Sequence, residues 1–143
     1  MGRCRGVSLA ELVLVLVITG ILLGAALPRL AGGGDRWIVA EAREEVIGLV
    51  YQARMEARRW GEAVLVVESG GGGARVEVPE RGLVGAWEPR VPGLRVEVAG
   101  PRDEAHLVFG PSGTGRLANA TLRLHRGDQV REVVISSYGR VRR

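Results

Sequence analysis

The longest hydrophobic pattern in this chain is an almost wholly apolar run near its N-terminus. It covers residues 7–28, VSLAELVLVLVITGILLGAALP, and Glu11 is its one charged residue. As an α-helix, Val7 to Leu27 would be about 31 Å long, close to the hydrocarbon thickness of a bilayer. Arg3 and Arg5 precede the run and favour a cytoplasmic N-terminus. A carboxylate costs about 2.5–3.5 kcal/mol near the centre of a membrane helix, so Glu11 requires a reason.

Three interpretations of the run differ in where the chain is cut. A secretory signal would be cut after the apolar residues, near GAALPRLA, and a plain anchor would stay uncut. A third class of segment is cut before the apolar residues, here after Gly6. A signal or an anchor gains nothing from an acid at Glu11, which favours the third interpretation.

A second pattern, with a helical period, follows between Asp35 and Trp60. Its apolar residues recur at intervals of three and four, which predicts an amphipathic helix with one face for a sheet: Val39, Ala42, Val46, Leu49, Val50, Ala53 and Ala57. Gly20, Gly24 and Pro28 weaken the preceding helix. The glycines at 32–34 predict a second break, after which Asp35 would cap a new helix.

The rest of the chain is a series of short runs with strand character. They cover residues 63–69, 74–78, 94–98, 106–110, 120–126 and 130–137. Glycines 70–73 join the first pair and Gly127-Asp128 joins the last pair, so both pairs are predicted to form hairpins. An N-terminal helix packed on antiparallel strands is an α+β fold.

Charge is unevenly distributed in the remaining sequence. All 20 basic residues are arginines, against 16 acids. From Ala105 to the end the chain carries seven arginines and two acids, Asp128 and Glu132. Cys4 is the only cysteine, so no disulfide is possible within one chain.

The start of the chain resembles the class III leader of type IV prepilins and type II secretion pseudopilins. Gly6, Glu11 and Pro28 fall on the positions of the family's cleavage glycine, its fifth mature residue and the proline that ends its apolar stretch. Val7 stands where the family usually has Phe. The resemblance implies that a prepilin peptidase cuts between Gly6 and Val7, with N-methylation of Val7. Glu11 would then pair in a fibre with the new α-amino group of a neighbouring subunit, because an opposite charge makes a buried carboxylate tolerable.

The second half is similar to pseudopilins of the GspH/FimT type. QARMEARRWGEAVLVV matches their helix end and first strand, and LVFGPSGTGR contains their F-x-P-x-G turn at Phe109, Pro111 and Gly113. YGRVRR matches their C-terminal G-R-x-R ending at Gly139, Arg140 and Arg142. The resemblance covers both ends and most of the chain, and residues 79–105 are not diagnostic.

The arginines at the C-terminus are the candidate for binding. In FimT-type minor pilins this region is implicated in DNA capture during natural transformation. The resemblance therefore implies Arg140 and Arg142 as DNA contacts, together with Arg143, Arg126 and Arg131. Arginine suits this role because it grips phosphate with two hydrogen bonds and stacks on bases. The alternatives are a solvated basic tail and a GspH-like pseudopilin of a type II secretion system, with a purely structural role.

Catalytic and metal sites have no support in the sequence. GPSGTGR lacks the lysine of a phosphate-binding loop, and His106 and His125 are the only histidines. We expect no enzyme activity and no cofactor. The expected organisation is a leader at 1–6, a transmembrane and assembly helix at 7–28, the second half of the helix at 29–60 and a β-rich domain at 61–143. The expected location is the inner membrane, crossed once, with the C-terminal domain in the periplasm; partners are other pilin subunits, the prepilin peptidase and DNA.

Overall fold

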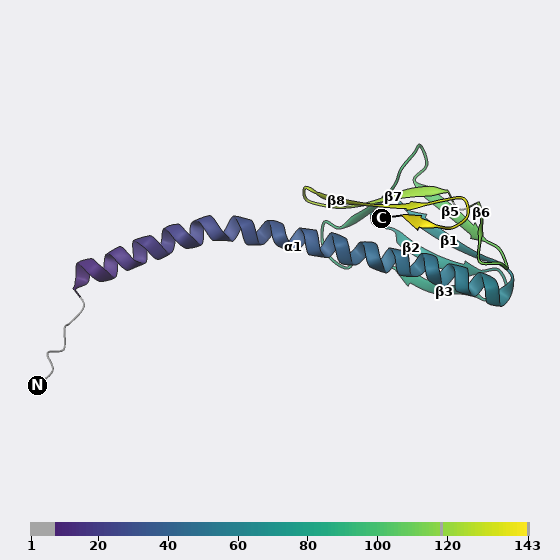
Figure 1. Cartoon of the computed structure of the whole chain (residues 1–143), viewed down its shortest axis with the longest axis horizontal. Helices are drawn as coiled ribbons and strands as arrows, with labels where there is room; N and C mark the ends of the chain where they lie inside the picture. The colour runs from purple at the N-terminus through teal and green to yellow at the C-terminus, as the bar shows by residue number, and fades with distance from the viewer. Residues whose placement is uncertain (1–7, 118, 143) are drawn as a thin grey trace, which may run out of the picture. The chain divides into compact units, whose positions relative to one another are not determined.

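The computed structural model describes residues 8–117 and 119–142. Its elements are one helix, α1 (Leu9–Trp60), followed by strands β1 (Ala63–Glu68), β2 (Gly73–Val78), β3 (Gly82–Trp87), β4 (Arg95–Val98), β5 (Glu104–Phe109), β6 (Gly115–Leu117), β7 (Ala120–Arg126), β8 (Gln129–Ile135) and β9 (Val141–Arg142). The expected α+β fold, with an N-terminal helix on antiparallel sheets, is confirmed (Figure 1).

The strands form two antiparallel sheets. The first has the order β3-β2-β1-β5-β6 and the second the order β4-β7-β8-β9. Both predicted hairpins are present, since Val67 lies opposite Ala74 and Arg126 lies opposite Gln129. The sheets meet where the Gly70 N–H donates to the Val96 carbonyl at 2.7 Å and the Val98 N–H donates to Ser69 Oγ at 2.9 Å.

The core lies within the compact unit Asp35–Arg143. The predicted apolar face of α1 is buried in it, from Val39 to Ala57, and packs on the inward residues of both sheets. Phe109, Leu65, Leu107, Leu122 and Leu124 are its largest fully buried side chains. The helical period therefore identified the face of α1 that builds the core.

The predicted break at residues 32–34 is wrong, because α1 continues through them without interruption. A glycine keeps both backbone hydrogen-bonding groups and costs a helix only about 1 kcal/mol relative to alanine. Asp35 consequently lies inside the helix and caps nothing. Its Oδ1 instead forms an ion pair with Arg126 Nε at 3.0 Å.

Three strands escaped the sequence patterns: β3, β6 and β9. β3 is an edge strand that α1 holds by side chains. Gln52 Nε2 donates to the Val84 carbonyl at 3.0 Å, and Trp87 Nε1 donates to Glu45 Oε2 at 2.6 Å. β9 pairs with the end of β8, so Val141 and Arg142 form an edge strand and not a free tail.

Candidate functional site

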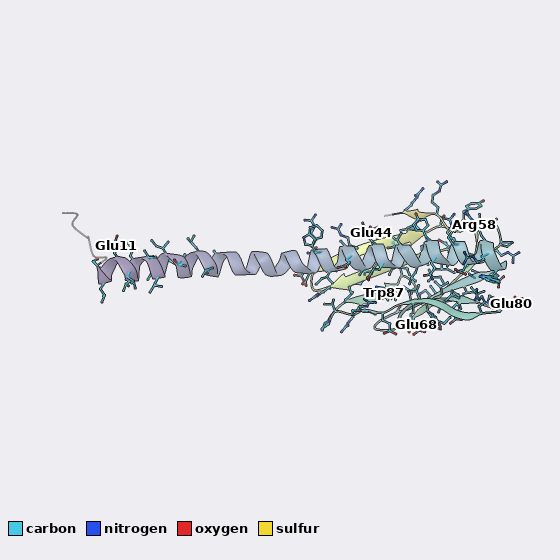
Figure 2. The ribbon with its side chains drawn as sticks, turned by 90° about the horizontal axis from the view of Figure 1, so that it is seen from below. Glu11, Glu44, Arg58, Glu68, Glu80 and Trp87 are labelled. Atoms are coloured by element: carbon cyan, nitrogen blue, oxygen red, sulfur yellow. The ribbon has the colours of Figure 1, made fainter. Side chains whose placement is uncertain are left out.

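The N-terminus of α1 has the sequence pattern of a capping box. Gly6 and Val7 lie outside the described residues. Ser8 and Glu11 occupy the first and fourth positions of an S-x-x-E capping box. The Glu11 N–H donates to Ser8 Oγ at 3.2 Å, and the Glu11 carboxylate lies in the first turn, where the helix dipole favours negative charge (Figure 2). Sequence reasoning missed Ser8, although the capping spacing could have identified it.

The large apolar side chains that follow Glu11 are uncovered. From Leu9 to Leu23 each is between 48% and 83% exposed. A surface of this extent is characteristic of segments that meet a membrane or another protein. Among the described residues, no helix is both long enough and apolar enough to cross a membrane.

Arg140 and Arg142 lie at the β8–β9 turn and on β9. Val133 and Ile135 of β8 are buried, so Val134 and its partner Arg142 face the outer side of the second sheet. Arg140 immediately precedes β9, and both arginines are exposed. Arg143 lies outside the described residues.

Arg126 and Arg131 are at the other end of the same sheet. Arg131 lies opposite Leu124, near the β7–β8 turn, and shares the core-facing side of β8 with Ile135. Ile135 follows Arg131 by four positions, which correspond to about 13 Å along the strand. Arg126 is held by the ion pair with Asp35. The structure thus brings Arg140 and Arg142 together and places Arg126 and Arg131 away from them.

Two arginines of α1 hold the turn before β9 and the turn before β6. Arg54 Nε donates to the Gly113 carbonyl at 2.8 Å and Nη1 donates to the Gly139 carbonyl at 3.4 Å. Arg58, labelled in Figure 2 near the end of α1, donates from Nε to the Ser112 carbonyl at 3.3 Å. Both were missed, because no local pattern reveals a contact between residues this far apart in sequence. Arg54 is therefore not an idle surface arginine of the helix.

Most other arginines of the described strands are paired with acids. Arg75 forms ion pairs with Glu68, Glu77 and Glu104 on the outer side of the first sheet, and its hydrogen bonds, to Glu68 first and then Glu77, raise the pKa of its guanidinium. Arg123 donates to Glu132 at 2.8 Å, which raises the pKa of Arg123.

Arg116 lies 3.5 Å from Glu62. Within the described residues, Arg140 and Arg142 have no acidic partner, and this distinguishes them from the paired arginines on β2, β6 and β7.

The remaining candidates are a cleft and the two histidines. A cleft of about 870 Å³ is lined by residues between Val98 and His106, by Arg116, Asn119 and Ala120, and by Ser137. His106 Nε2 lies 3.1 Å from Glu104, and His125 Nε2 lies 3.0 Å from Glu97. In the described part of the chain, no three potential ligands from His, Cys, Asp and Glu converge on one metal position.

Comparison with known proteins finds a matching protein family for each part of the chain. The family model of the type II transport protein GspH matches residues 42–139, and the model of the prokaryotic N-terminal methylation motif matches residues 1–27. The chain belongs to the GspH family of pilin-like proteins. It is 34% identical over 154 aligned positions to the pilin-like protein PilA1 of Thermus thermophilus, covering 96% of this chain and 97% of that protein. No solved structure matches.

Membership of this family indicates how the protein is made and what it assembles with. A pilin-like protein is made as a membrane-anchored precursor, and the methylation motif fits processing by a prepilin peptidase. The family assembles with other pilin subunits.

Proposed function

We propose that this protein is a minor pilin whose domain binds DNA, contributing to DNA uptake in natural transformation. The observation that carries the proposal is that Arg140 and Arg142 lie two residues apart at one edge of the second sheet, both exposed and both without an acidic partner within the described residues. Because a paired carboxylate offsets the positive charge of an arginine and occupies some of its N–H donors, unpaired arginines are the better phosphate ligands.

The proposed setting is a fibre based in the inner membrane. The chain crosses this membrane once, with its C-terminal domain in the periplasm, and enters the fibre after cleavage between Gly6 and Val7. There Glu11 of one subunit pairs with the amino group of Val7 of a neighbour. The proposed role is structural and adhesive, with no catalytic step and no cofactor.

DNA binding is tested by replacing Arg140 and Arg142 together with glutamine. The full chain in detergent micelles is titrated with a labelled duplex of mixed sequence, and fluorescence anisotropy is followed at several salt concentrations. With about three phosphate contacts, the wild type should show a log–log salt slope near −2.7 and micromolar or weaker affinity, with little dependence on sequence. Loss of two contacts should make the slope less negative by about 1.8.

The matched control replaces two other exposed arginines, Arg36 and Arg90, with glutamine. It removes the same net charge but leaves Arg140 and Arg142 in place. It should therefore weaken binding only slightly and leave the salt slope near its wild-type value. Arg54 is unsuitable as a control because it holds the turn at Gly139. If wild type and the Arg140/Arg142 variant give the same curve, DNA binding by these arginines is refuted.

The second candidate is a minor pseudopilin of a type II secretion system, without DNA binding. The match of residues 42–139 to the GspH family model favours it. It predicts that the wild type shows no salt-dependent binding to any DNA. It also predicts that deleting the gene abolishes secretion of a protein and leaves transformation intact.

A further inference from the structure

Tyr138 is a solvent-facing aromatic residue beside the unpaired arginines. Its side chain is 77% exposed. No hydrogen bond, ring contact or ion pair joins it to any other described residue. The sequence neighbour Arg140 follows it by two positions. An aromatic side chain this exposed is available to a ligand.

The turn that carries Tyr138 is held by its own hydrogen bonds. The Gly139 N–H donates to the Ser136 carbonyl at 2.7 Å, and the Ser136 N–H donates to the Arg140 carbonyl at 2.9 Å. The Arg140 N–H also donates to Ser136 Oγ at 3.1 Å. A ring presented on such a turn loses little conformational freedom when it binds, which favours affinity.

Contacts with the core and with α1 also hold this turn in place. Gly139 is buried with φ +73°, and a Cβ at this position would lie 2.9 Å from Phe109 Cε1. Arg54 donates to the Gly139 carbonyl from the helix. Phe109 is a fully buried core residue. The backbone that carries Tyr138 is therefore held directly against the core and is not part of a free tail.

Arginines lie on the turn that carries Tyr138 or donate hydrogen bonds to it and to the neighbouring turn. Arg140 lies in its own turn, and Arg58 lies on the neighbouring turn through its hydrogen bond to Ser112. Arg54 connects the two turns, since it donates to both Gly113 and Gly139. An exposed aromatic ring among arginines is the combination that binds single-stranded nucleic acid: arginines follow the backbone, and bases stack on the ring.

We infer that Tyr138 is a stacking platform for an unpaired base, so that this surface takes single-stranded DNA in preference to duplex DNA. This inference rests on the DNA binding proposed above and adds the class of DNA. In a duplex each base is covered by its neighbours in the stack, and only an end or an unpaired strand offers a base face to Tyr138.

The test compares an oligothymidylate with a mixed-sequence duplex of the same length, each labelled and titrated with the full chain in detergent micelles. The wild type should bind the single strand more tightly. Tyr138→Ala should weaken binding to the single strand by about 5- to 150-fold, the range of one lost base–aromatic stack. Its affinity for the duplex should change by less than about twofold.

Two variants give the result its specificity. Tyr138→Phe keeps the ring and should retain the single-strand affinity within about twofold. Trp37→Ala removes an aromatic side chain that is 78% exposed, as open as Tyr138, and should leave both affinities unchanged.

The possible results separate the two proposals. Binding to neither DNA refutes the proposed function. Binding that Arg140/Arg142→Gln weakens but Tyr138→Ala does not, or a wild-type preference for duplex, refutes the stacking role while the proposed function stands.

Discussion

At the scale of single residues, Gly139 is the position where backbone conformation and packing are most closely linked. Its φ of +73° is unfavourable for any residue with a Cβ, and Phe109 occupies the space where that Cβ would lie. Gly139→Ala should lower the free energy of unfolding by about 2–5 kcal/mol, the sum of the backbone cost and the contact with a core ring. Urea denaturation followed by tryptophan fluorescence measures this change.

Gly82 supplies a matched control for that substitution. Its φ is +72°, but a Cβ there would meet nothing within 4 Å. Gly82→Ala should therefore cost only the backbone part, about 1–2 kcal/mol. Equal losses for the two variants would show that the contact with Phe109 contributes nothing, contrary to our account of how the β9 turn is held.

What sequence could reveal at this scale depended on the range of the interaction. Gly6, Glu11 and Pro28 form a linear motif and were found together. The role of Arg54 was not predictable, because the two carbonyl groups that it reaches lie 59 and 85 residues further along the chain. The pairing of Arg126 with Asp35 was missed for the same reason.

At the scale of elements, Glu11 in the first turn of α1 has two roles to distinguish. Its charge can act in fibre assembly, and it can stabilise the start of the helix. Glu11→Val should leave membrane insertion intact or improved, because it removes a charge from an apolar helix. It should also lower incorporation into fibres, because the amino group of a neighbouring subunit loses its counter-charge. Immunoblotting of sheared fibres against the membrane fraction measures both effects.

Ser8→Ala separates the assembly role from the capping role. It removes Ser8 Oγ, one of the two acceptors of the Glu11 N–H, at a cost of about 1 kcal/mol to the helix start, and it leaves the carboxylate in place. Fibre incorporation should stay near the wild-type level. If Ser8→Ala lowers incorporation as much as Glu11→Val does, Glu11 acts through the helix start and the pairing role is wrong.

Sequence patterns predicted elements where one face is buried along a regular repeat. The amphipathic face of α1 and the two hairpins, β1–β2 and β7–β8, were predicted correctly on this basis. Strand β3, GLVGAW, has two glycines and no alternation, and β9 has only two residues. These strands exist because an edge is available to pair with, and α1 helps to hold β3, neither of which local sequence records.

At the scale of the whole molecule, the buried core belongs to one compact unit. All core residues, from Val39 to Ile135, fall within Asp35–Arg143, and so does the ion pair between Asp35 and Arg126. The described large apolar residues from Leu9 to Leu23 are exposed and add nothing to that core. Among the described side chains, those whose burial stabilises the fold therefore all lie within residues 35–143.

We predict that a chain of residues 35–143 folds cooperatively without detergent. It should show one urea transition and a near-ultraviolet circular dichroism signal, because Trp87 remains packed against α1 through Glu45. A shorter chain, residues 43–143, serves as the comparison: it lacks the buried side chains of Val39 and Ala42 and the partner of Arg126. Losing a buried valine costs about 1.5–3 kcal/mol on its own, so the shorter chain should unfold at clearly lower urea. A broad transition without near-ultraviolet signal for residues 35–143 would contradict the prediction and make the N-terminal segment necessary for folding.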